Sequence, residues 1–192
     1  MRSFFIGTGA AAPIFLFLGS EIMRKNIRHM THAAIIAALY VALTLLQNFL
    51  LPGSTSMAIQ FRAAEALCVL ALFTPAAIDG LVIGCLIFNL TYAGALPLDP
   101  VLGTAATLGA TLTMWLCRGI TVKGYPLLSL MMPALWNALL VGLELTIYIG
   151  GSFWINALYV AIGEGAVLLT LGTVLFYTLK TRKLDTRLFG NR

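Results

Sequence analysis

An arginine and a glutamate three positions apart, Arg62 and Glu65, lie inside an otherwise apolar stretch of about 56–73. A charge near the centre of a bilayer costs at least about 2.5 kcal/mol, so it normally faces a partner or a polar cavity and marks a functional site. On an α-helix, residues at i and i+3 share one face, so these two charges can neutralise each other. The pair would then either brace helix packing or form one wall of a binding site.

Further polar residues interrupt other apolar segments: Asn89, Asn137, Glu144, Tyr148 and Glu164. With a rise of about 1.5 Å per residue, most of them fall in one layer with Arg62 and Glu65, roughly 12 to 18 Å from the nearest loop. Asn137, Glu144 and Tyr148 are spaced by seven and four residues, which places them on one helix face. One arginine cannot balance three glutamates. The excess of acceptors therefore indicates a cationic or hydrogen-bond-donating guest, or protonated acids.

The sequence lacks the common enzyme motifs that we considered. The sequence contains no G-x-S-x-G, no H-E-x-x-H and no ATP-binding P-loop, and both histidines, His29 and His32, lie near the amino-terminal end of the first apolar segment. We therefore predict no catalytic residue, no metal site and no cofactor. The polar layer favours a binding protein over an enzyme.

The elements that position these residues are apolar segments separated by Pro and Gly. Of 192 residues, 60% are hydrophobic and only 10% are charged, far more apolar surface than one soluble core could bury. Continuous Leu-, Ala- and Gly-rich runs favour helices over a barrel. The expected segments are Thr31–Leu51, about Ser56–Phe73, Ala77–Tyr92, Pro100–Cys117, Pro126–Ile149 and Phe153–Leu179. We predict an all-α membrane protein, a bundle of six transmembrane helices spanning a 23–192 domain.

Basic residues mark one side of this bundle. They precede the first segment, lie between the fourth and fifth, and follow the sixth, whereas the loops 52–55, 93–99 and 150–152 contain no Lys or Arg. By the positive-inside rule, both termini are expected to be cytoplasmic. The net charge of +5 is thus an orientation signal rather than a sign of a nucleic-acid partner. Residues 1–22 resemble a signal peptide but fit neither that role nor a span, so we assign them as an extension.

Small residues form a stripe on the first segment. Ala34, Ala38 and Ala42 recur at four-residue spacing, with Ala33 and Ala37 beside them. Such stripes let another helix approach closely. The stripe would either pack inside the bundle or dock a second membrane protein.

Several runs together resemble the QueT family: AAIIAALYVALT, IQFRAAEAL, GCLIFNL, LDPVLGTAATL, NALLVGLEL and FWINALYVAIGEG. The resemblance extends in order from about Met23 to Lys180. Members of this family are identified as substrate-binding S components of prokaryotic energy-coupling-factor (ECF) transporters, assigned to queuosine precursors. The resemblance implies a six-helix protein of the plasma membrane that captures a vitamin-like solute from outside. It also implies partners, namely a transmembrane T component and two cytoplasmic ATPases.

The resemblance implies roles for the residues already singled out. The alanine stripe would dock the T component, and the loop from Pro52 to Ile59 would cover the pocket. Glu144 and Glu164 would meet the donor-rich edge of a deazaguanine base, while Asn89 and Asn137 would read its carbonyl and ring nitrogens. The residues leave three alternatives open: an S component for another vitamin-like solute, an autonomous proton-coupled carrier of a small heterocycle, and a purely structural membrane protein.

Overall fold

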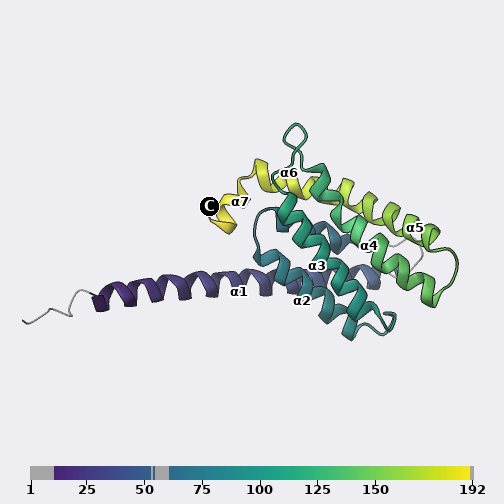
Figure 1. Ribbon diagram of the computed structural model, residues 1–192, viewed down its shortest axis with the longest axis horizontal. Coiled ribbons are helices and arrows are strands. Elements are labelled where there is room, and N and C mark those ends of the chain that lie inside the picture. Colours follow the sequence, from purple (N-terminus) through teal and green to yellow (C-terminus); the bar gives the residue numbers. More distant parts are fainter. Residues whose placement is uncertain (1–10, 53, 55–60, 191–192) are drawn as a thin grey trace, which may run out of the picture.

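The computed structural model describes residues 11–52, 54 and 61–190, and every element labelled in Figure 1 is a helix. The α-helices are α1 (Ala11–Leu50), α2 (Ala76–Thr91), α3 (Asp99–Cys117), α4 (Leu127–Tyr148), α5 (Phe153–Val167), α6 (Thr173–Thr181) and α7 (Leu184–Phe189). A 3₁₀-helix, η1 (Ala63–Leu72), precedes α2, and a π-helical turn, η2 (Leu168–Gly172), joins α5 to α6.

Four helical runs are long and apolar enough to cross a membrane: 25–50, 99–117, 127–148 and 153–181. The last of them is continuous through α5, η2 and α6, as expected for the sixth segment. Large apolar side chains such as Phe49 and Trp154 are 82% and 77% exposed, which suits a lipid environment. The helical, multi-pass membrane character is thus confirmed, while η1 and α2 are shorter apolar helices of 10 and 16 residues.

The first segment differs from its expected bounds. Helix α1 begins at Ala11 rather than Thr31, so residues 11–22 continue directly into the first span. Figure 1 shows this amino-terminal part of α1 projecting beyond the other helices. Residues 1–10 lie outside the described part of the chain, as does most of the predicted covering loop from Pro52 to Ile59.

Helix η1 occupies the centre of the bundle. It packs against α1, α2, α3, α4, α5, η2 and α6, and eight of its ten residues are buried. At about 2.0 Å of rise per residue, a 3₁₀-helix of this length reaches about 20 Å, against about 15 Å for an α-helix. The element that carries Glu65 therefore runs through the middle of the molecule.

The expected α-helix through Arg62 and Glu65 is wrong. Arg62 is extended (φ −101°, ψ 96°) and η1 begins one residue later. The cause is the side-chain amide of Gln47 on α1, whose Oε1 accepts the Ala63 N–H at 2.7 Å and whose Nε2 donates to the Phe61 carbonyl. These bonds satisfy backbone groups that an earlier helical turn would otherwise have to pair.

Helices α1 and α2 touch through small residues. A Cβ on Gly80 would lie 2.6 Å from the Ala33 carbonyl oxygen, and one on Gly84 would lie 2.9 Å from that of Ala37. Ala33 and Ala37 are buried in this contact and face α2 in the chain alone, so their contact with a partner stays a prediction. The other three alanines of the stripe are exposed: Ala34, Ala38 and Ala42.

Candidate functional site

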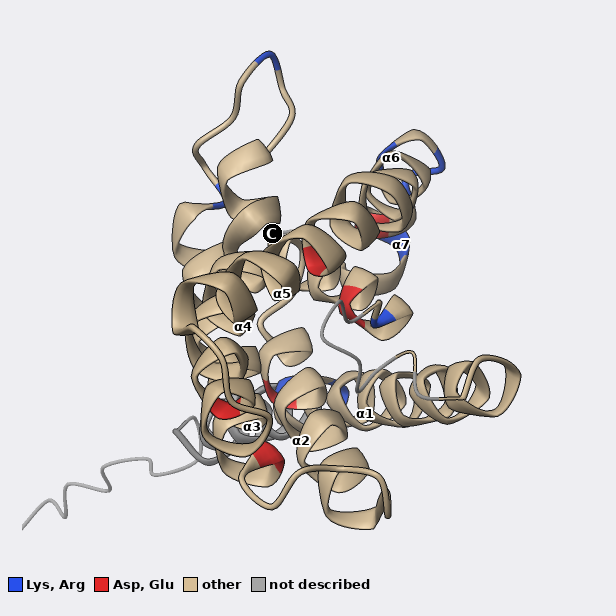
Figure 2. Ribbon diagram, turned by 90° about the vertical axis from the view of Figure 1, so that its right-hand side faces the viewer, with Lys and Arg blue, Asp and Glu red and all other residues tan. Residues whose placement is uncertain are grey.

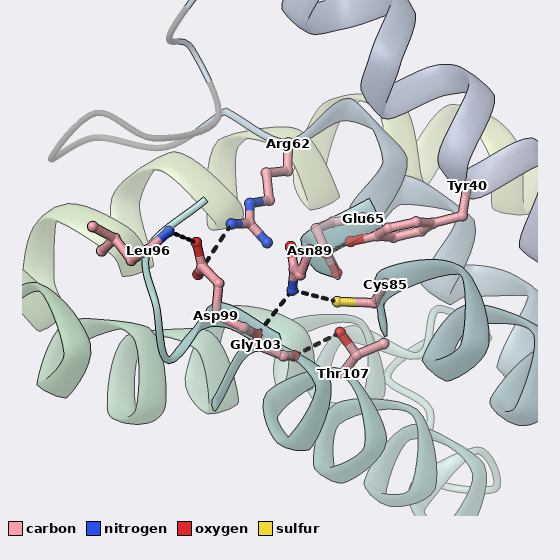
Figure 3. Close-up of polar contacts among 9 residues, drawn as sticks. All are labelled: Tyr40, Arg62, Glu65, Cys85, Asn89, Leu96, Asp99, Gly103 and Thr107. Atoms are coloured by element: carbon pink, nitrogen blue, oxygen red, sulfur yellow. Dashed lines mark hydrogen bonds and ion pairs between the residues drawn. The ribbon is translucent and has the colours of Figure 1, made fainter. Parts of the chain in front are cut away.

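Arg62 belongs to the buried polar cluster shown in Figure 3. Its side chain is 5% exposed, and its Nη2 lies 3.9 Å from Asp99 Oδ1. The other carboxylate oxygen of Asp99 accepts the Leu96 N–H at 2.7 Å. Asp99 is the first residue of α3, and its carboxylate folds back to the preceding loop and toward Arg62.

Glu65 has different partners from those expected. The Tyr40 hydroxyl, from α1, donates to Glu65 Oε1 at 2.9 Å, and Cys68 Sγ lies 3.3 Å from Oε2. Tyr40 is fully buried and its ring points into the cluster in Figure 3. Sequence analysis missed both Tyr40 and Asp99. The only local signal was one tyrosine within an apolar helix and one aspartate beside a proline.

Asn89 connects α2 to α3. Its Nδ2 donates to the Asp99 carbonyl oxygen at 2.9 Å and lies 3.4 Å from Cys85 Sγ. Gly103 makes room for the amide, because a Cβ at that position would lie 2.9 Å from Asn89 Nδ2. Asn89 Oδ1 is buried and accepts no hydrogen bond from the described residues.

Glu144 on α4 and Glu164 on α5 complete the cluster. Both are buried, and no N–H or hydroxyl donor of the described residues reaches either carboxylate oxygen of Glu144 or Oε2 of Glu164. The Asp99 carboxyl lies within hydrogen-bonding range of Glu144, so these two acids can share a proton. Glu144 interacts electrostatically with Asp99 and Arg62, while Glu164 interacts with Glu65 and Arg62.

Two pairs of acids, Asp99 with Glu144 and Glu65 with Glu164, thus interact electrostatically within each pair and with Arg62. One guanidinium is within electrostatic reach of four of the seven acidic residues of the chain. Several acceptors in this cluster have no donor within the described structure. A guest that supplies donors or positive charge would satisfy them.

The remaining predicted residues divide into two groups. Asn137 is buried on α4, as is Glu144, while Tyr148, the last residue of that helix, is 42% exposed. Tyr148 therefore differs from Asn137 and Glu144 in burial, and its contact with a guest stays a prediction. Beside Glu164, a Cβ on Gly165 would meet no atom within 4 Å, so there is open space at that glycine.

Comparison with known proteins supplies the family. A family model described as QueT transporter matches residues 30–181, from within α1 to the end of α6, and includes the whole acid cluster. No curated protein and no solved structure matches the chain. The matched family is one of transporters and not of enzymes. Since the match covers well over half of the chain, this membrane transport protein belongs to the QueT transporter family.

Proposed function

We propose that the chain is the substrate-binding S component of an ECF transporter and that it captures a queuosine precursor, a deazaguanine base, from outside the cell. The excess of buried acceptors supports this proposal most directly. Both Glu144 oxygens, one Glu164 oxygen and the Asn89 carbonyl oxygen have no N–H or hydroxyl donor within the described residues. Leaving a buried polar group unpaired costs about 1 to 3 kcal/mol, so four such atoms favour a bound donor.

A deazaguanine matches this need chemically. Its guanidine-like edge presents several N–H donors, and its aminomethyl form adds a cation. In the proposed complex, Glu144 and Glu164 accept from these donors, and Asn89 and Asn137 read the carbonyl and ring nitrogens. The Arg62 guanidinium contacts the base, and Asp99 orients this guanidinium. Glu65 is held in place by Tyr40 and balances Arg62.

The proposed topology places all six segments, including η1 and α2, across the plasma membrane of a prokaryote with both termini in the cytoplasm. The distribution of basic residues supports it, since Lys and Arg lie on the α3–α4 loop and on α6 and α7 (Figure 2). A T component and two ATPases supply the energy, because the chain has no P-loop of its own. Ala34, Ala38 and Ala42 form the proposed T-component docking surface.

Ligand-dependent stability of the purified protein tests the site. We expect cyano- and aminomethyl-deazaguanine or queuine to raise the unfolding free energy by about 2.7 kcal/mol at 100-fold excess over Kd, whereas adenine does not. Glu144→Gln and Glu164→Gln should lose this stabilisation. Asp79→Asn is the matched control, because its exposed carboxylate pairs with His29, outside the cluster. If both glutamine variants keep wild-type affinity, the assigned pocket is wrong.

A proton-coupled carrier is the alternative that the same residues favour, since unpartnered Glu144 and Glu164 could carry protons. Uptake by proteoliposomes containing this chain alone, without an ATPase, separates the two. The S-component proposal expects no uptake until the T component and ATPases are added.

A further inference from the structure

A second site lies at the basic end of the bundle, away from the acid cluster. A groove of about 420 Å³ is bounded by the carboxyl end of η1, the α3–α4 loop, α6 and α7. Its charged lining residues are Arg118, Lys180 and Asp185, and its apolar lining includes Leu72, Phe73 and Phe176. The groove takes no part in the proposed capture of a deazaguanine.

Two cations reach this groove from different elements. The Arg118 guanidinium stacks over Trp115, with Cζ 3.7 Å from the ring centroid, and it donates one hydrogen bond to the Trp115 carbonyl oxygen. Lys180 Nζ lies 5.3 Å from the centroid of the Phe176 ring. In the described structure neither cation forms an ion pair. Stacking on an aromatic ring limits the motion of a cation while leaving N–H donors for an anion.

The position of the groove indicates an amphiphilic ligand. It lies where three apolar runs terminate, since α3 ends at Cys117, α4 begins at Leu127 and the 153–181 run ends at Thr181. Further basic residues lie on the same α3–α4 loop and after α6: Lys123, Arg182, Lys183 and Arg187. Ends of apolar spans with clustered Lys and Arg lie at the level of lipid headgroups.

We propose that this groove binds the phosphodiester of a membrane glycerophospholipid whose headgroup carries hydrogen-bond donors. Arg118 and Lys180 bind the phosphate, and the Leu72, Phe73 and Phe176 side chains contact the glycerol and the first methylene groups. Asp185 accepts from the headgroup hydroxyl or ammonium groups. Among the lining residues, two cations and one carboxylate leave a net positive charge, which attracts the negative charge of a phosphodiester.

Native mass spectrometry of the detergent-purified full chain tests the proposal. Equal concentrations of short-chain phosphatidylglycerol, phosphatidylethanolamine, phosphatidylcholine or inorganic phosphate are added, and bound adducts are counted. Phosphatidylglycerol and phosphatidylethanolamine should bind, while phosphatidylcholine, which has no headgroup donor, should bind less. Arg118→Gln and Lys180→Gln should each lower the adduct about fivefold, corresponding to about 1 kcal/mol per basic residue at a membrane surface.

Two further variants sharpen the result. Lys123→Gln removes the same charge from the α3–α4 loop outside the groove lining and should change the adduct little. Asp185→Asn should raise phosphatidylcholine binding relative to the other two lipids, a change of selectivity that a folding defect would not produce. Equal adducts in wild type and in both cation variants would overturn the proposal, and so would competition by inorganic phosphate at equal concentration. Unchanged lipid adducts together with lost copurification of transporter subunits would instead identify an acidic protein segment as the occupant.

Discussion

At the scale of single residues, Arg62 determines whether four buried acids can coexist. It interacts electrostatically with Glu65, Asp99, Glu144 and Glu164, and its Nη2 lies 3.9 Å from Asp99 Oδ1. Removing one partner of a buried ion pair costs about 3 to 5 kcal/mol, because it leaves the other charge uncompensated. Arg62 is therefore a structural requirement of the site as well as a candidate ligand contact.

We predict that Arg62→Gln lowers the free energy of unfolding by about 3 kcal/mol and that adding Asp99→Asn recovers part of this loss. The recovery follows because the second change removes the carboxylate that the first leaves unbalanced. Denaturant unfolding in detergent of the single and double variants measures the coupling. Strictly additive losses would mean that the two side chains do not interact.

A second prediction for single residues compares Tyr40 with Tyr148. Tyr40→Phe removes the hydroxyl that donates to Glu65, and we expect a loss of about 1 to 3 kcal/mol in stability together with weaker deazaguanine binding. Tyr148→Phe is the control, since that side chain is exposed. Isothermal titration with a deazaguanine measures the affinity of both variants. A larger loss of affinity for Tyr148→Phe would mean that Tyr148 contributes more to the binding site than Tyr40.

Local sequence signals explain which elements were predictable. The apolar runs predicted the ends of α2, α3, α4 and the α5–α6 run to within about two residues, because Pro, Gly and loop residues separate these runs. The form of η1 could not be predicted. It depends on the Gln47 amide, 16 residues earlier in the chain, binding the backbone of Ala63. The π-helical turn η2 likewise leaves no local signature in an apolar segment.

For the site, too, local sequence signals identified some residues, while others depend on the folded structure. A polar side chain inside an apolar segment is rare and costly, which singled out five residues that the structure buries: Glu65, Asn89, Asn137, Glu144 and Glu164. Asp99 was not singled out, because an aspartate directly before a proline is common at the start of a helix. Only the folded loop before α3 brings its carboxylate toward Arg62.

At the scale of elements, the α1–α2 contact depends on glycine. We predict that Gly80→Ala destabilises the protein by about 1 to 3 kcal/mol, because its Cβ would meet the Ala33 backbone oxygen at 2.6 Å and would separate the two helices. Gly165→Ala is the matched control, since open space surrounds that position and alanine favours helix. Thermal unfolding of both variants is the measurement. Equal stability would show that the helices separate without cost.

At the scale of the whole molecule, η1 joins the two ends of the bundle. Its start adjoins Arg62 and carries Glu65 in the acid cluster, and its last residue, Leu72, lines the groove at the basic end. Because η1 touches nearly every other helix, a guest that orders the acid cluster would also order the packing around it. The exposed stripe on α1 faces away from the α2 contact of that helix, so the proposed docking and the proposed capture would use separate surfaces.

This separation yields a prediction for assembly. Ala38→Phe should reduce copurification with the T component, because a bulky side chain on the exposed stripe prevents close helix approach. It should leave deazaguanine-induced stabilisation unchanged, since Ala38 is exposed and lies outside the acid cluster. Leu43→Phe, at an exposed position of α1 outside the stripe, is the control and should copurify normally. Equal copurification of the two variants would move the docking surface to another face, whereas loss of ligand response in Ala38→Phe would show that capture and docking share one surface.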